Sequence, residues 1–259
     1  MKRFRHITFV AFCLLLAPAS VVEAQRWLGD ATLRFRAGWN VGGTSPVGLP
    51  ASIRSLNTYR LQPNLSFGLV VDKPVAGKWG VETGLVFEGK GMRTDATVKN
   101  YHMDIIRGGQ ELEGRFTGGV TTLVREWMFT VPVQATYALS HKFSIHGGPY
   151  FSVLTSRGFC GAAHNGYLRV GNPTGVKVEL GSDGATSGNY DFSDHMRYLQ
   201  WGLGVGADWY VGPRLGFYAG LNWGLNGIHH SDFHTIEQTL YPIFGSIGFT
   251  YKFKNKTTL

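Results

Sequence analysis

The chain has 259 residues, a formal net charge of +8 at pH 7 and 43% hydrophobic residues. Its basic residues are spread along the chain rather than gathered in one patch, which argues against nucleic acid as a partner. No segment after residue 24 approaches the roughly 18 to 20 consecutive apolar residues of a membrane helix. A protein of this composition that crosses a membrane therefore crosses it as strands.

The N-terminus has the pattern of a secretory signal. Basic residues at positions 2, 3 and 5 precede an apolar stretch from Ile7 to Leu16, and a small-residue cleavage site ends at Ala24. We expect cleavage there, so that residues 1–24 are a signal peptide and Gln25 begins the mature chain. An uncleaved membrane helix fits less well, because the apolar stretch is short and ends before Pro18.

The predicted mature chain has a single thiol. Cys13 leaves with the signal, so only Cys160 remains and no intramolecular disulfide can form. We interpret Cys160 as a buried thiol in a loop, and the alternative is an intermolecular link.

Eight segments of the mature chain alternate between apolar and polar residues, the period of a strand with two different faces. The clearest two flank the turn Val211–Arg214, and each has about eleven residues, the length of a tilted strand that crosses a bilayer. Pro132 cannot donate to a sheet ladder, so we expect a bulge or bend at that position. In chain order the predicted strands are Ala31–Val41, Asn64–Asp72, Trp79–Gly91, Leu123–Leu139, Phe143–Leu154, Leu199–Trp209, Leu215–Leu225 and Ile243–Phe253.

The connections between these segments alternate between long and short. Long loops are predicted after Val41, at Met92–Thr122, at Thr155–Met196 and at Asn226–Leu240. Bacterial outer-membrane barrels have an even number of strands, short periplasmic turns and long outer loops. The pattern predicts an all-β fold, an eight-stranded antiparallel up-and-down transmembrane β-barrel with long extracellular loops and both termini in the periplasm. Residues 25–253 would form the barrel domain, and residues 254–259 a short C-terminal tail.

The two faces of the predicted strands differ in chemistry. The polar face is rich in glycine and lacks the Lys/Glu coat of a soluble surface, which favours a membrane barrel surrounded by outer-membrane lipid. A lipocalin-type secreted barrel is the main alternative, because alternation alone does not say which face points inward. Aromatic residues lie near the strand ends of the apolar face, as in the girdles of membrane barrels: Trp39, Trp79, Trp127, Trp209, Trp223 and Tyr251.

Charged residues mark the face that points into the lumen. Two arginines spaced by two positions on the first strand cannot face hydrocarbon. An eight-stranded barrel is only wide enough for its own side chains, so we interpret the inward charges as ion pairs that fill the lumen. The alternative is a narrow conduit. The predicted network comprises Arg34, Arg36, Glu82, Glu88, Lys90, Asp208 and Lys252.

Five stretches together resemble the PorT-like outer-membrane β-barrel family of Bacteroidota: WGVETGLVFEGKG at Trp79–Gly91, FTVPVQATY at Phe129–Tyr137, HGGPY at His146–Tyr150, WGLGVGADWY at Trp201–Tyr210 and GFTYKF at Gly248–Phe253. The resemblance covers most of the mature chain and implies an eight-stranded outer-membrane barrel. It is specific for architecture rather than activity. The name-giving member is implicated in a protein secretion and gliding apparatus, so the resemblance implies such a role as one alternative. Family members often end at the aromatic residue of the last strand, whereas KNKTTL follows Phe253 here.

Candidate chemistry outside the lumen is sparse. We expect no metal site, and the weaker alternative is a site in the last loop, where imidazole and carboxylate ligands are closely spaced at His229, His230, Asp232 and His234. No GxSxG motif occurs. His146 and Ser152 share a strand face but lie roughly 20 Å apart, too far for a catalytic dyad. We therefore expect no catalytic residues, no cofactor and no enzyme.

The long loops are the remaining place for function. Long ordered loops on a rigid barrel commonly carry recognition sites. We predict a membrane anchor or interaction scaffold that meets a protein partner through its extracellular loops. The alternatives are a narrow porin or solute conduit and a subunit of a secretion or gliding apparatus.

Overall fold

The computed structural model of the protein describes residues 30–46, 48, 50–233, 235–236 and 239–253. The predicted signal peptide, residues 1–24, and the predicted tail, residues 254–259, lie outside the described residues. The described part contains eleven strands and the short 3-10 helix η1 (Ser193–His195). None of its helices has the length and apolar character needed to cross a lipid bilayer.

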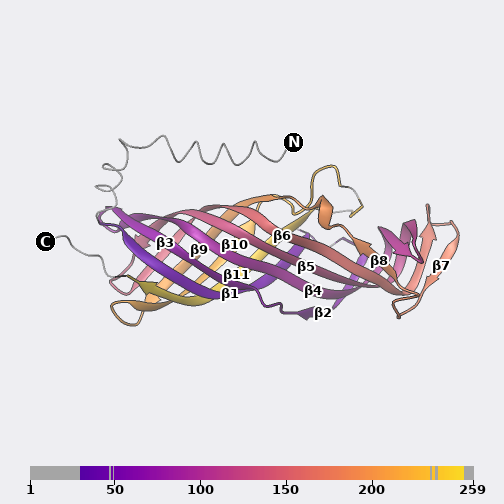
Figure 1. Cartoon of the computed structure of the whole chain (residues 1–259), viewed down its shortest axis with the longest axis horizontal. Coiled ribbons are helices and arrows are strands. Elements are labelled where there is room, and N and C mark those ends of the chain that lie inside the picture. The colour runs from indigo at the N-terminus through magenta and orange to yellow at the C-terminus, as the bar shows by residue number, and fades with distance from the viewer. Residues whose placement is uncertain (1–29, 47, 49, 234, 237–238, 254–259) are drawn as a thin grey trace, which may run out of the picture.

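Eight of these strands close into an antiparallel barrel, seen along its side in Figure 1. Each strand pairs with the next around the ring, and the last pairs back to the first from Arg34 opposite Lys252 to Pro46 opposite Leu240. The predicted eight-stranded up-and-down barrel is therefore confirmed. The ring consists of β1 (Thr32–Pro46), β3 (Leu65–Ala76), β4 (Trp79–Arg107), β5 (Gln110–Ala138), β6 (Phe143–Val170), β9 (Leu199–Tyr210), β10 (Leu215–Gly224) and β11 (Leu240–Lys252).

The outer surface of the ring is a continuous apolar belt. Side chains at alternate positions of every barrel strand are exposed, for example Phe35 on β1, Phe129 on β5 and Phe249 on β11. Aromatic pairs occur toward both ends of the belt, with Trp79 against Tyr137 at a ring-centroid distance of 4.8 Å and Trp127 stacked on Phe87 at 5.2 Å. A surface this apolar is suited to lipid hydrocarbon rather than to water.

Glycines on the inner face make room for large side chains from neighbouring strands. Gly38 of β1 lies opposite Gly248 of β11, and Tyr218 of β10 fills the space above both. A Cβ atom at Gly38 would clash with the Tyr218 hydroxyl. In this narrow lumen, glycines of one strand therefore lie beside bulky side chains of a neighbouring strand.

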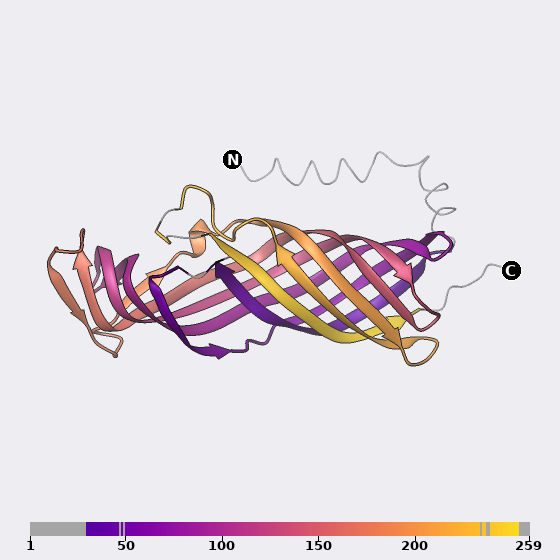
Figure 2. The same ribbon diagram turned by 180° about the vertical axis from the view of Figure 1, so that it is seen from behind.

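Three barrel strands are much longer than predicted. β4 and β5 have 29 residues each and β6 has 28, and they continue well past the ends of the other barrel strands (Figures 1 and 2). The predicted long loop Met92–Thr122 is wrong, because β4 and β5 run through it and meet at the glycine turn 108–109. The first part of the predicted loop Thr155–Met196 is also strand, up to Val170.

The reason for this error is a reversal of polarity along the inner face. On β4 the inward residues Glu82, Glu88 and Lys90 are buried polar groups, and the next inward residue, Met92, begins an apolar series. β5 changes at the same level, because Lys90 lies opposite Glu126 and Met92 lies opposite Val124. Below this level the outer face meets lipid, whereas above it the outer face meets water, so the apolar face must turn inward.

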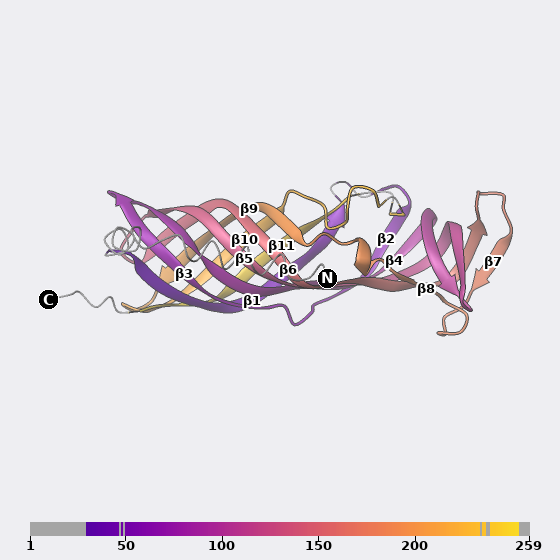
Figure 3. The ribbon, with the colours of Figure 1, turned by 45° about the horizontal axis from the view of Figure 1, so that its top comes forward.

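The part of the described chain above this level forms a small folded unit that we call the head. It comprises the described residues within 42–63, 91–125, 156–198 and 226–241. Three short strands belong to it: β2 (Ile53–Arg60), which pairs with β4, β7 (Lys177–Leu180), which pairs with β6, and β8 (Gly188–Asp191), which bridges β6 and β4. Figure 3 shows these strands beside the extended parts of β4 and β6. The head has its own hydrophobic core, in which Phe116, Val124, Leu168, Met196 and Ile228 are fully buried.

Two smaller predictions also need correction. Cys160 is free and half-buried, but it lies in β6 opposite Leu123 rather than in a loop. A bulge or a bend was predicted at Pro132, and the register is unshifted across this residue, so the bulge is wrong. Instead, the β4–β5 ladder has no paired residues between Thr130 and Val133, which accommodates the missing proline donor.

Candidate functional site

The lower half of the lumen contains a cluster of buried ion pairs built on two arginines of β1. Arg34 and Arg36 occupy alternate positions of the strand, so both side chains point inward. Glu82 of β4 accepts from both, at 2.7 Å from Arg34 Nη2 and 2.6 Å from Arg36 Nη1. Asp208 of β9 also contacts both, at 3.2 and 2.8 Å. The structure therefore brings four predicted network residues together across the lumen.

Asp72 is a member of this cluster that the sequence analysis did not include. It lies near the end of β3, and its carboxylate is 2.9 Å from Arg34 Nη2. It also accepts from Thr136 of β5 at 3.0 Å. Asp72 stands opposite both Thr32 and Glu82 in the sheet, so its inward position could have been found from the face shared with Glu82.

The upper half of the lumen holds a second cluster. Lys90 Nζ lies 3.1 Å from Glu88 Oε1, and both side chains are buried. Asn40 and Thr130 donate to Glu88 at 2.9 and 2.6 Å. Glu126, which the predicted network omitted, is also buried here and accepts from Gln200 at 2.7 Å. Charged and neutral polar groups thus meet at this level of the lumen.

Lys252 is placed differently from the prediction. Its ammonium lies 3.4 Å from the centroid of the Tyr210 ring, and within the described residues it makes a cation–π contact rather than an ion pair. The predicted network therefore separates into two clusters with Lys252 beside the lower one.

Little free space remains among these side chains. The cavity lined by Arg36, Glu88, Thr130 and Tyr218 in the middle of the lumen has a volume of about 80 Å³. This volume holds a few water molecules and no more. The side chains form a buried ion-paired network, and passage through it would require breaking buried pairs.

The predicted last-loop group does not form a metal centre from its described members. His229 packs its ring against Phe159 and Phe233, with centroids 4.8 and 4.7 Å away. Burial, with smaller effects from His195 and His230, lowers the pKa of His229 to about 4. His234, the fourth candidate, lies outside the described residues. The described part of this loop is packed by aromatic contacts rather than by ligands.

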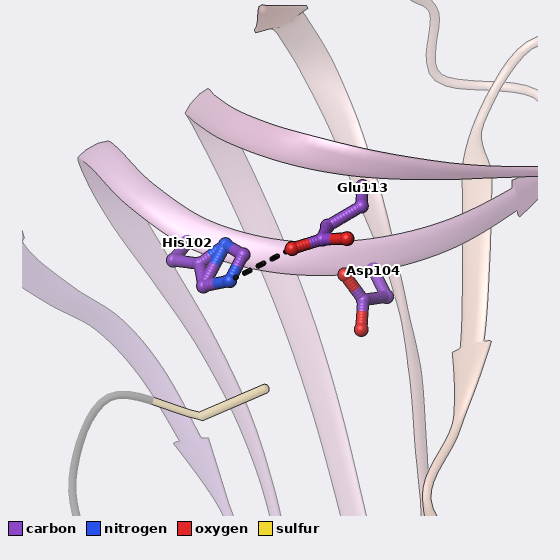
Figure 4. A group of neighbouring side chains, drawn as sticks. All are labelled: His102, Asp104 and Glu113. Atoms are coloured by element: carbon purple, nitrogen blue, oxygen red, sulfur yellow. Dashed lines mark ion pairs between the residues drawn. The ribbon is translucent and has the colours of Figure 1, made fainter. Parts of the chain in front are cut away.

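A different trio comes close to a metal-ligand arrangement. His102 and Asp104 of β4 and Glu113 of β5 offer ligand atoms within 4.8 Å of one another (Figure 4). His102 Nε2 lies 3.4 Å from Glu113, and Asp104 accepts from Thr235 at 2.8 Å. The Glu113 side chain is 70% exposed. One oxygen of Asp104 is therefore already bonded to the last loop, and Glu113 faces solvent.

A large cavity lies at the base of the head. It has a volume of about 440 Å³, and its walls come from β1, β2, β4 and β5 together with residues near the start of β11. This cavity was not predicted, because its β4 and β5 walls lie in segments that were predicted as a loop.

Neutralising Glu82 tests the buried network. The variant Glu82→Gln should lower the free energy of unfolding by about 3–5 kcal/mol, because two buried arginines lose a shared counter-charge. Urea unfolding in lipid vesicles, followed by tryptophan fluorescence, measures the change.

The matched control is Glu179→Gln on β7, whose side chain is 69% exposed. It should change the free energy of unfolding by no more than about 0.5 kcal/mol. Equal effects of both variants would contradict a stabilising role for the lumen pairs.

The low pKa of His229 predicts a pH-dependent last loop. A histidine whose folded pKa of about 4 lies below its ordinary value of 6.5 stabilises the packed loop while it is neutral. The stabilisation is complete above pH 6.5 and is lost as the pH falls toward 4. Hydrogen exchange of the Ile228 and His230 amides, corrected for intrinsic rates, should therefore accelerate in this window.

The variant His229→Phe should keep the aromatic contacts and remove the pH dependence. His141→Gln, in the exposed turn between β5 and β6, serves as the control and should leave it unchanged. The same acceleration in His229→Phe would show that another group titrates.

Several known proteins are similar to this chain. One solved structure that resembles the chain is Ail, the attachment invasion locus protein of Yersinia pestis, with 12% sequence identity and a TM-score of 0.35; the match covers 87% of this chain and 99% of Ail. Another is Neisserial surface protein A, with 10% identity and a TM-score of 0.35; the match covers 86% of this chain and 97% of that protein. The outer membrane protein OprG of Pseudomonas aeruginosa has 14% identity and a TM-score of 0.31, and the match covers 86% of this chain and 96% of OprG. No curated protein matches. The outer membrane protein beta-barrel domain family matches residues 24–230, well over half of the chain. The chain therefore belongs to this family and is a β-barrel protein of the bacterial outer membrane.

Proposed function

We propose that the protein is a non-enzymatic outer-membrane anchor with a closed lumen, which displays its head outside the cell to bind a protein partner. The observation that carries this proposal is the head itself. Strands β4, β5 and β6 continue beyond the apolar belt and build a separate hydrophobic core. A folded, rigid surface of this kind is pre-organised for recognition, because little conformational entropy is lost on binding.

The ion pairs in the lumen support the closed state over the alternative of a conduit. Arg34, Arg36, Glu82 and Asp208 span the lumen from three strands, and the remaining space beside them is small. The proposal that the protein is not an enzyme rests on similar contacts. His146 is hydrogen-bonded to Gln134, and Ser152 is hydrogen-bonded to Thr130. The histidine is therefore not positioned to deprotonate the serine.

The orientation of the barrel follows from its connections. Short turns join the strands at the end where Arg34 faces Lys252, and the head lies at the opposite end. Because outer-membrane barrels keep short turns on the periplasmic side, we place both termini in the periplasm and the head outside. A PorT-like origin in Bacteroidota, and with it a role in a secretion or gliding apparatus, is a second proposal supported by the sequence resemblance.

Cysteine labelling of intact cells tests the orientation. In a Cys160→Ser background, Glu111→Cys places a thiol at the exposed tip of the head, and Pro213→Cys places one in the exposed β9–β10 turn. A membrane-impermeant maleimide should label Glu111→Cys on intact cells and Pro213→Cys only after permeabilisation. The reverse pattern would place the head in the periplasm.

Copurification from gently solubilised outer membranes tests the function. The wild-type protein should carry a protein partner in fixed stoichiometry and should form no steady channel in planar bilayers. A variant in which Lys99–Thr117 is replaced by Asn-Gly should lose the partner, because Val98 and Gly118 are paired and a two-residue turn can join them.

The variant barrel must still show heat-modifiable migration on a denaturing gel, which reports a folded barrel. Retention of the partner by this variant would place the binding surface elsewhere. A steady channel in the wild-type protein, without a partner, would favour the conduit.

A further inference from the structure

The cavity at the base of the head has the size and chemistry of a ligand site. Its volume of about 440 Å³ lies within the range of roughly 300–1,000 Å³ usual for small-molecule pockets. Met92, Val98, Met103 and Phe159 contribute apolar walls, and all four belong to the buried core of the head. An apolar ligand could therefore be enclosed without breaking a polar contact.

A gap in the sheet gives this cavity a mouth. The pairing of β1 with β3 ends at Trp39 opposite Leu65, and above that level β2 pairs with β4 in the described residues. Arg54 and Leu56 of β2 are exposed and also line the cavity, so the mouth opens at β2. The Tyr59 hydroxyl donates to the Gly42 carbonyl, which ties β2 to β1 across this gap.

The mouth lies next to the apolar belt. Val41 of β1, which is 42% exposed, belongs to the belt and lies two residues before the β1 segment that lines the cavity. Ile243 of β11 is 36% exposed and also lines the cavity. The apolar lining is thus continuous with the lipid-facing surface, which suits an alkyl chain better than a compact polar molecule.

Polar groups in the cavity wall suit a ligand that carries an anionic acceptor as well as such a chain. Arg54 is the one charged residue among the described lining residues. The Thr44 hydroxyl, in a residue that is 4% exposed, has no hydrogen-bond partner among the described residues. A ligand oxygen that accepts hydrogen bonds would satisfy such a buried donor.

We propose that this cavity binds one long-chain carboxylate, with the alkyl chain inside and the carboxylate at Arg54. One chain fits the enclosed volume, whereas the two chains of a phospholipid need more space. The site does not depend on a protein partner, so it goes beyond the function proposed above and stands or falls separately from it.

Binding of radiolabelled palmitate to the full-length mature protein in phosphatidylcholine nanodiscs tests the proposal. The wild-type protein should bind palmitate saturably, above the background of empty discs. Ala96→Trp fills the cavity from the inner face of β4 and should weaken binding by about tenfold or more. The control Thr97→Trp lies on the exposed face of the same strand and should change affinity by less than about twofold.

A second pair of measurements tests the position of the carboxylate. Arg54→Gln should weaken palmitate binding by about two- to fivefold, as expected for an exposed charge, and should leave binding of the uncharged hexadecanol unchanged. Heat-modifiable migration establishes that each variant is folded, and Thr94→Trp replaces Ala96→Trp if the latter is not.

Three results would overturn the proposal. The first is equal palmitate binding by the wild-type protein and the folded cavity-filling variant. The second is a palmitate signal that does not exceed empty discs. The third is photocrosslinking of the cavity residues by a photoactivatable phospholipid of the disc but not by a photoactivatable fatty acid, which would make a bilayer lipid the occupant.

Discussion

Two arginines of β1 reach across the lumen to carboxylates of β4 and β9, and the packing of the lower lumen depends on these contacts. Arg34 and Arg36 share Glu82 and Asp208, so strands that are not neighbours in the ring are linked through its centre. Eight strands leave an interior only as wide as their own side chains. Within that width a charged residue must meet an opposite charge or a polar group, because an unpaired buried charge is strongly destabilising.

The same sheet contacts lipid hydrocarbon along one part of its length and water along the other. Below the level of Lys90 and Glu126 the outer face meets hydrocarbon and the inner face is polar. Above that level the outer face meets water and the inner face forms the core of the head. Strands β4, β5 and β6 cross the boundary without interruption, so the head continues directly from the barrel without a linker along these strands. Its cavity lies where the two regions meet, beside the gap between β1 and β2.

Strand positions in the barrel could be predicted because lipid on one side and a crowded lumen on the other impose an alternation of period two. The alternation of long and short connections then gave the strand number. The head was missed for the same reason. Its strands place apolar residues such as Val98, Val120 and Phe116 inward, whereas glycines and hydroxyl residues interrupt the outer face. A search for strands with an apolar outer face therefore assigns Met92–Thr122 to a polar loop.

The amino-acid sequence by itself determined the class of the protein, the eight strands of the barrel and the inward face that carries Arg34, Arg36, Glu82, Glu88, Lys90 and Asp208, because these depend on local alternation. Only the tertiary structure decided which charges meet, because these contacts join strands that are distant in the chain. Asp72 and Glu126 belong to the clusters, and Lys252 contacts the Tyr210 ring. The tertiary structure also decided the folded head and its cavity, whose walls come together from β1, β2, β4, β5 and β11 only when the ring closes.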